Sequence, residues 1–298
     1  MVDGGGHMVI APEQIPTGFA APSPKRRRRV WLRIVLVVGV ALAVVLGMSA
    51  YGVVRYATRS HPGAKSVNSA IDNYRHTADP SSGSGYAEPA AGVYSLHGQG
   101  SEHISFPPNS QKDGAVMPAT VTHLAGGCWR LHIDYNTSHA EEFVFCPTGA
   151  GLAQPTNINI QHWDYGAFGV SNTSTVSCPA GTVVLPVTPA AGQTLTWSCP
   201  ETNTSVSGNS TSTTHATIVG VGWVKVGSSS VLAAHELQQT TVAGAQTGTV
   251  TENWRFDVAT GMPVRIDRQI SIHTNSPIGA IEYTESGNWT LASLTPHT

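Results

Sequence analysis

Charged side chains are scarce in this chain. Asp, Glu, Lys and Arg make up only 11% of its 298 residues, whereas hydrophobic residues make up 40%. Disordered chains have the opposite balance, so disorder of the whole chain is excluded. A basic excess is also missing from residues 55–298. The whole chain has 16 basic and 18 acidic residues, and positions 1–54 hold six basic and two acidic ones, so ten basic and sixteen acidic residues remain for 55–298. A mildly acidic body lacks the charge needed to bind a polyphosphate, so no nucleic-acid partner is expected.

Recognised catalytic and metal-binding motifs are missing as well. The chain has no G-x-S-x-G of a serine hydrolase and no C-x-x-C of a zinc ribbon or thioredoxin. Glu141 and Glu142 are adjacent, so they point to opposite faces of a strand and form no local two-carboxylate site. His132 and His139 could meet across strands, but no histidine spacing matches a metal motif. We therefore expect no metal, no cofactor and no catalytic residue.

One long hydrophobic run is present, at residues 34–54 (IVLVVGVALAVVLGMSAYGVV), without charge or proline. At about 1.5 Å per residue, such a helix crosses the roughly 30 Å hydrocarbon core of a membrane. Residues 25–29 (KRRRR) precede the run and only scattered basic residues follow it, and the richer positive flank stays in the cytoplasm. We predict a disordered cytoplasmic tail at 1–29, a transmembrane signal anchor at 30–54 and an extracytoplasmic remainder on the cell membrane.

A cleaved signal peptide is the alternative for the same segment. Signal peptides have an apolar core of about 7–15 residues and a cleavage site with small residues, as in A-x-A. The run here is longer, and residues 48–50 (MSA) match that site poorly. The uncleaved anchor is therefore favoured.

The amino-acid composition of the chain changes after the hydrophobic run. Residues 55–91 are predicted to be a stalk and linker, with a possible short helix where Val67, Ile71 and Tyr74 follow a helical spacing. From residue 92 to 298, Thr, Val, Ser and Gly dominate and turn signals recur about every ten residues. This pattern is typical of an all-β domain, built from a mainly antiparallel sheet that forms a curved half-barrel or a sandwich.

The clearest strand pattern lies at residues 249–273, where apolar and polar side chains alternate on both sides of a loop at 259–261 (ATG). A glycine at the end of a three-residue loop supplies the left-handed backbone conformation that such a hairpin needs. A hairpin centred on Thr260 pairs these residues across the strands: Phe256 with Val264, Trp254 with Ile266, Arg255 with Arg265, and Glu252 with Arg268.

The apolar face of this hairpin gives a candidate ligand site. Four apolar side chains form its expected lining and one charged pair its expected mouth: Trp254, Phe256, Val264 and Ile266, with Glu252 and Arg268. The alternative is that the same six residues are ordinary core packing with one ion pair at the margin of the core.

Other strands are predicted from shorter patterns. A second hairpin is expected from residues 280–285 and 288–294, joined across Ser286-Gly287. Further strands are expected in four segments: 194–197, 213–219, 222–226 and 231–241.

All four cysteines follow the hydrophobic run, so the predicted topology places them in an oxidising compartment, where disulfides form. Three connectivities are possible, but the spacing favours neighbouring cysteines. Cys128 and Cys146 flank a predicted hairpin with its midpoint at Thr137, and Cys178 and Cys199 flank a turn near residues 188–189. Two local disulfides are therefore expected.

A sortase-like transpeptidase is the less favoured enzymatic alternative. Residues 194–199 (TLTWSC) resemble the T-L-x-T-C of that family, but one residue is inserted and the next arginine, Arg255, lies far along the chain. If Cys199 forms a disulfide, it has no thiolate to act as a nucleophile.

A longer pattern covers residues 184–268, about a third of the chain. It includes a strand segment around Trp223, where an acidic residue is usual, and the segment NWRFDVATGMPVR. This region resembles the extracytoplasmic β half-barrel envelope proteins of the LolA and LppX type. Five residues fill that family's motif W-x-D-x-x-x-G-L-P-x-R with minor drift: Trp254, Asp257, Gly261, Pro263 and Arg265. The resemblance implies a curved sheet whose concave face binds lipids or lipidated proteins.

These observations predict a membrane-anchored, non-enzymatic extracytoplasmic β domain that binds a lipid or another apolar envelope ligand. The alternative is a structural or protein-interaction domain of the cell envelope. The expected partners are the membrane itself and a lipid or an envelope protein.

Overall fold

A computed structural model of the chain describes residues 24–77, 88–276 and 279–297. The chain divides into two compact units, residues 1–54 and residues 55–298. Helix α1 (Pro24–Ala57) contains a stretch, Leu36–Ala57, that is long and apolar enough to cross a membrane. Most of the predicted cytoplasmic tail lies outside the described residues, and its last six residues, 24–29, belong to α1. Lysine and arginine favour helix, so the helix begins before the apolar run.

The second unit consists mainly of one antiparallel sheet, so the predicted all-β class is confirmed. In chain order its strands are β1 (Gly92–Ser105), β2 (Pro108–Lys112), β3 (Val116–His123), β4 (Trp129–Asp134), β5 (His139–Thr148), β6 (Gly151–Asp164), β7 (Gly169–Ser177), β8 (Val183–Pro186), β9 (Thr194–Asn203), β10 (Ser210–Val226), β11 (Ser229–Gly244), β12 (Gln246–Asp257), β13 (Pro263–Ser276) and β14 (Gly279–Leu291). A short helix, α2 (Val67–Thr77), packs on β1 and β3 through the buried Ile71.

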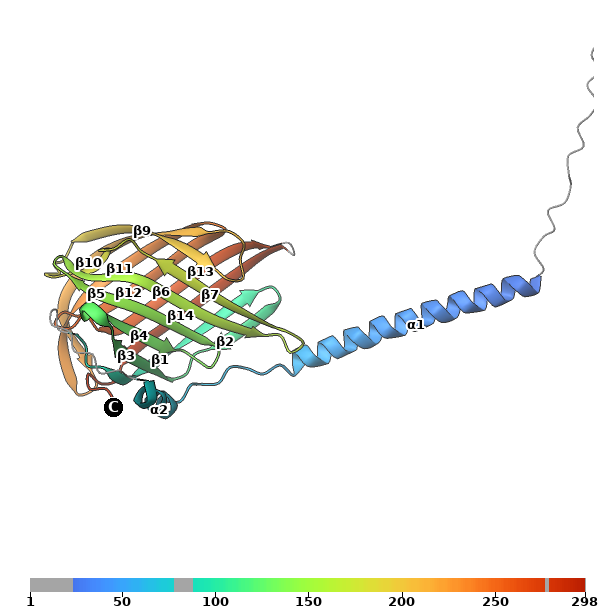
Figure 1. Cartoon of the computed structure of the whole chain (residues 1–298), viewed down its shortest axis with the longest axis horizontal. Coiled ribbons are helices and arrows are strands. Elements are labelled where there is room, and N and C mark those ends of the chain that lie inside the picture. The colour runs from blue at the N-terminus through green and yellow to red at the C-terminus, as the bar shows by residue number, and fades with distance from the viewer. Residues whose placement is uncertain (1–23, 78–87, 277–278, 298) are drawn as a thin grey trace, which may run out of the picture. The chain divides into compact units, whose positions relative to one another are not determined.

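Twelve strands close into a barrel, so the sheet curves further than a half-barrel (Figure 1). Their order around the barrel is β1, β3, β4, β5, β6, β7, β9, β10, β11, β12, β13, β14, and β14 returns to pair with β1. The closing pairs run from Leu96 opposite Leu291 to Ile104 opposite Tyr283. Strands β2 and β8 add short pairings to β1 and β6. Closure removes most of the free sheet edge, although β7 and β9 pair over only three residue pairs, from Ser174 opposite Asn203 to Val176 opposite Glu201.

One end of the barrel, here called the plugged end, is filled by apolar side chains. It carries the turns at 149–150, 227–228 and 258–262. The largest side chains of this core are fully buried, and several of them are aromatic: Trp129, Phe145, Phe256, Leu152, Leu185 and Trp254. The opposite end, here called the open end, carries the loops at 106–107, 165–168 and 204–209. Residues of those loops line an interior cavity, so the packed core fills only part of the barrel.

The β12–β13 hairpin confirms most of the predicted register. Trp254 lies opposite Ile266 and Glu252 opposite Arg268, but Phe256 faces Pro263 instead of Val264. The irregularity arises because the turn is longer than three residues: the Asp257 amide donates to the Met262 carbonyl at 2.9 Å. The Asp257 carboxylate also accepts bonds from the Ala259 amide and the Thr260 hydroxyl.

The predicted second hairpin at Ser286-Gly287 is wrong, because β14 continues without a turn through both residues. Gly287 lies under the indole of Trp289, where an added Cβ would be 2.2 Å from the ring carbon Cζ2. The glycine therefore permits close packing of an aromatic ring rather than a turn. Similarly, the two segments predicted at 213–219 and 222–226 form one strand, β10, with an irregularity between Ile218 and Gly220.

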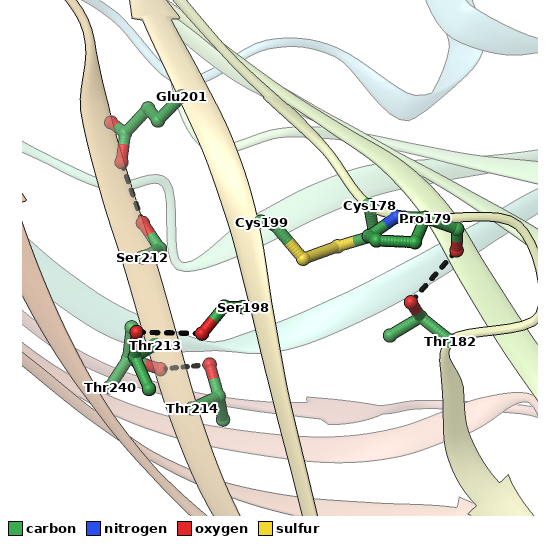
Figure 2. Close-up of a disulfide and its surroundings, with 10 residues drawn as sticks. All are labelled: Cys178, Pro179, Thr182, Ser198, Cys199, Glu201, Ser212, Thr213, Thr214 and Thr240. Carbon is green, nitrogen blue, oxygen red and sulfur yellow. Dashed lines mark hydrogen bonds between the residues drawn. A yellow bond between two sulfur atoms is a disulfide. The ribbon is translucent and has the colours of Figure 1, made fainter.

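Both predicted disulfides are present. Cys128–Cys146 has a Cα–Cα distance of 4.1 Å across the β4–β5 hairpin, and Cys178–Cys199 one of 4.5 Å. Figure 2 shows the second bridge between the segment after β7 and strand β9. The chain between these two cysteines is not a simple turn near residues 188–189, because β8 leaves it to pair with β6.

Replacing both Cys178 and Cys199 with serine is expected to lower the free energy of unfolding by about 3 kcal/mol. The bridge closes a loop of 21 residues, and a loop of about that length restricts the unfolded chain by roughly that amount. Urea unfolding of the full chain in detergent, followed by tryptophan fluorescence, measures the change. Ser198→Ala on the same strand removes one exposed hydroxyl bond to Thr213 and should leave the midpoint nearly unchanged. Equal midpoints for the double variant and the wild type would contradict the prediction.

Candidate functional site

A cavity of about 670 Å³ lies inside the barrel between the plugged end and the open end. Much of its wall is apolar, with these side chains among the lining: Ile104, Phe143, Trp163, Trp197, Ile270 and Ile272. At the open end it reaches Phe106 and Phe168, whose side chains are 48% and 55% exposed. The cavity is therefore a blind pocket with an exposed rim and a buried floor.

Polar side chains are distributed along this wall in a regular way. On β6, Asn157, Asn159 and Gln161 occupy alternate positions, so all three face the interior. Two and three strands further around the barrel from β6, β9 and β10 contribute a carboxylate and hydroxyls to the wall. Glu201 accepts a bond from Ser212 at 2.7 Å, and Thr214 bonds Thr240 at the same distance (Figure 2). The wall thus combines apolar area with hydrogen-bonding groups that are largely paired with each other.

Arg268 lies at the floor of the cavity, and its guanidinium group is buried among carboxylates. Its Nε donates to Glu252 Oε1 at 2.7 Å, and its Nη1 donates to Glu141 Oε2 at 2.7 Å and to Glu285 Oε1 at 3.3 Å. Tyr135 donates its hydroxyl to Glu141 at 3.0 Å. Burial disfavours the charged guanidinium, but the charge of Glu141 and its neighbours outweighs burial and raises the pKa of Arg268 further.

A second buried group lies beside this one and includes Glu102, His139 and Glu285. His139 Nδ1 is 3.0 Å from Glu102 Oε1, and both side chains are 1% exposed. Tyr283 donates its hydroxyl to Glu285 Oε2 at 2.6 Å. Burial disfavours the charged imidazole, but the nearby charge of Glu102 raises the pKa of His139 to about 9. Burial raises the pKa of the Tyr283 hydroxyl well above its usual value.

Asp113 lies at the edge of this group. Its Oδ2 accepts a bond from Trp289 Nε1 at 3.1 Å. Burial, together with the charge of Glu285, raises the pKa of Asp113 to about 7. The barrel interior therefore holds several carboxyl groups that compete for few positive charges.

The six residues nominated from the sequence lie in three places. Trp254 lines the cavity beside its floor, whereas Phe256, Val264 and Ile266 lie in the packed core and are not among the cavity-lining residues. Glu252 and Arg268 do pair, but they lie in the barrel interior instead of at a mouth or at the margin of the core. Barrel closure causes this difference, because it encloses a sheet face that a half-barrel leaves open.

Glu102, Glu141, His139 and Glu285 were not among the site residues expected from the sequence. A signal for two of them was present: His139 and Glu141 share their strand parity with the buried Phe143 and Phe145. Glu142, on the other parity, faces outward and contacts His132 at 3.1 Å. His132 and His139 therefore do not meet, because they lie on opposite faces of the barrel wall. Glu102 and Glu285 gave no local signal, since their strands meet only through closure.

Cys199 is in a disulfide and is 1% exposed. It therefore offers no thiol for the sortase-like alternative.

No protein-family model matches the chain, and no curated protein matches it. Among solved structures, it is similar to the hypothetical lipoprotein YmcC from Escherichia coli K12, with 11% sequence identity over 68% of this chain and 85% of that chain. The TM-score of 0.30 is too low for this likeness to carry an argument about fold or function. The resemblance to LolA and LppX stays a prediction from sequence motifs.

Proposed function

We propose that this protein is a non-enzymatic, membrane-anchored barrel that binds an elongated, largely apolar ligand such as a lipid acyl chain outside the cytoplasm. The blind cavity of about 670 Å³ carries this proposal. Its volume falls in the range of ligand pockets, which are mostly apolar with a few placed polar groups. Apolar surface at its rim, at Phe106 and Phe168, suits the entry of an apolar molecule.

Two features support the proposed location. Basic residues at 25–29 precede the apolar stretch of α1, which favours a cytoplasmic N-terminus. The two disulfides, which follow that helix in the chain, fit an oxidising compartment. Together they favour an anchor at the cell membrane, with residues 30–54 as the spanning segment and residues 92–298 as the extracytoplasmic domain.

Replacing Val250 with tryptophan is expected to lower ligand binding at least tenfold. Val250 lines the cavity, so a larger side chain there fills part of the pocket. Native mass spectrometry of the full chain released from a mild detergent measures bound amphiphile directly. We expect wild-type protein to carry a bound amphiphile and Val250→Trp to retain at most a tenth of it.

The neighbouring residue provides the matched control, because Thr249 is exposed on the outer face. Thr249→Trp adds the same side chain outside the cavity and should keep the wild-type amount of bound amphiphile. Bound amphiphile that survives in Val250→Trp, or a wild-type protein without any, would favour the structural or protein-interaction alternative, which a native pull-down of the full chain then tests.

A further inference from the structure

Three buried side chains from strands far apart in the sequence converge beside the cavity-lining residues Gln161 and Tyr283. Glu102 comes from β1, His139 from β5 and Glu285 from β14, and each places one potential ligand atom within 4.8 Å of the others. All three are at most 4% exposed. Carboxylate and imidazole groups buried together are either paired or coordinate a cation.

The hydrogen bonds of this group are incomplete. Glu102 Oε1 and His139 Nδ1 are both buried, yet neither completes a hydrogen bond, although they lie 3.0 Å apart. The hydroxyl of Tyr283 is 2.6 Å from a Glu285 oxygen and 3.1 Å from a Glu102 oxygen. A tyrosine hydroxyl has one proton to donate, so it cannot bond both carboxylates at once. Glu102 Oε2 and Glu285 Oε2, the two oxygens that face Tyr283, therefore have no positive partner among the described residues, because His139 and Arg268 contact the other oxygen of each carboxylate.

The charges of the surrounding groups lead to the same conclusion. Four carboxylates of the barrel interior surround one guanidinium and one imidazole: Glu102, Glu141, Glu252 and Glu285, with Arg268 and His139. With all four carboxyl groups ionised and the imidazole protonated, these six side chains carry two more negative than positive charges. Uncompensated buried charge is costly, and a divalent cation that replaces the imidazole proton reduces the excess.

We propose that Glu102, His139 and Glu285 form a binding site for one divalent transition-metal ion such as Zn²⁺. Mixed imidazole and carboxylate ligands suit zinc and related ions. Ligands about 2.1 Å from a tetrahedral zinc ion lie about 3.4 Å apart, so the three side chains would have to move together by about an ångström.

The neighbouring residues already supply the outer contacts that metal ligands usually have. Gln161 donates to Glu102 at 2.9 Å, and Asn159 lies 2.9 Å from His139 Nε2. With the amide of Asn159 turned by 180°, its oxygen accepts Nε2–H and leaves the Nδ1 lone pair free for the metal. Gln161 and Tyr283 also line the cavity, so a cation reaches the site by passing these two side chains.

The test uses the full chain without a polyhistidine tag, in detergent, stripped with EDTA and then titrated with Zn²⁺. Bound zinc per chain is measured by elemental analysis after desalting, and affinity by competition with a chelating dye. We expect one bound Zn²⁺ per chain, and an affinity at least tenfold lower in Glu285→Gln and in Glu102→Gln.

Glu142→Gln provides the matched control, because Glu142 contacts His132 on the outer face of the same strand that carries His139. It should bind Zn²⁺ like the wild type. An equal loss of affinity in Glu142→Gln and Glu285→Gln, or the absence of stoichiometric Zn²⁺ in the wild type, would overturn the proposal.

A measurement on the wild-type protein alone tests the proposal if the substituted proteins do not fold. Wild-type chain loaded with Co²⁺ should show the visible absorption of a cobalt ion with nitrogen and oxygen ligands and no thiolate band, and a spectrum like that of free Co²⁺ would also overturn the proposal. The metal readings do not depend on the apolar ligand, so failure of one proposal leaves the other standing.

Discussion

Replacing Arg268 with methionine is expected to lower the free energy of unfolding by about 3–5 kcal/mol at pH 7, because it leaves buried carboxylates without their cation. Arg268 is 4% exposed and donates to three carboxylates, those of Glu141, Glu252 and Glu285. Methionine fills a similar volume but provides no charge and no donor. Removing one partner of a buried ion pair costs far more than the pair contributes in net stability.

The loss in Arg268→Met should shrink as the pH falls. Burial already raises the pKa of Glu252, and Arg268 opposes that rise. Without the guanidinium, the pKa of the folded-state carboxyl rises further, so this group destabilises the folded state increasingly as pH rises above the unfolded pKa. Urea unfolding of the full chain at pH 5 and at pH 8 measures the difference, and the larger loss is expected at pH 8.

Arg265→Met is the matched control on the same strand. Arg265 faces outward, is 47% exposed and pairs with Asp267 at 2.9 Å. Exposed pairs contribute little, so this substitution should change the unfolding free energy by at most about 1 kcal/mol at either pH. A similar loss in both variants would show that the buried cluster is not what makes Arg268 important.

Replacing Glu236 with glutamine is expected to stabilise the protein at alkaline pH and to leave it nearly unchanged at pH 5. Glu236 is fully buried. Its Oε1 accepts a bond from Gln238 at 2.9 Å, while its Oε2 is without a hydrogen-bond partner. Burial raises the pKa of Glu236 from 4.5 to about 8. The unfolded chain therefore releases this proton at lower pH than the folded chain does.

The sign and size of the effect follow from that difference. Stability that depends on protonated Glu236 is fully present below about pH 4.5 and is lost as pH rises to about 8, by up to about 1.4 kcal/mol per pH unit. Glutamine does not titrate, so the unfolding free energy of Glu236→Gln should exceed that of the wild type by on the order of 4 kcal/mol at pH 8. Glu282→Gln, at an exposed carboxylate, should follow the wild-type pH profile. Parallel profiles for wild type and Glu236→Gln would contradict the assigned burial of this charge.

Local patterns predicted much of the sheet because strand pairing between neighbours leaves a short-range trace. Alternation with a period of two gave the pairs of Trp254 with Ile266 and of Glu252 with Arg268, which the β12–β13 hairpin contains. Neighbouring cysteines likewise pair across neighbouring strands. The pattern failed at Gly287, since a glycine that packs under an indole ring and a glycine in a turn look the same in the sequence.

By itself, the sequence determined the apolar helix, the all-β class, the local disulfides and the parity of individual strands, because each depends on residues close together in the chain. Only the tertiary structure decided that the sheet closes, where β1 meets β14 nearly two hundred residues away. Closure depends on how strand tilt and twist accumulate around twelve strands, and no local pattern records that sum. Closure of the barrel converts one sheet face into a cavity wall and brings Glu102, His139 and Glu285 together.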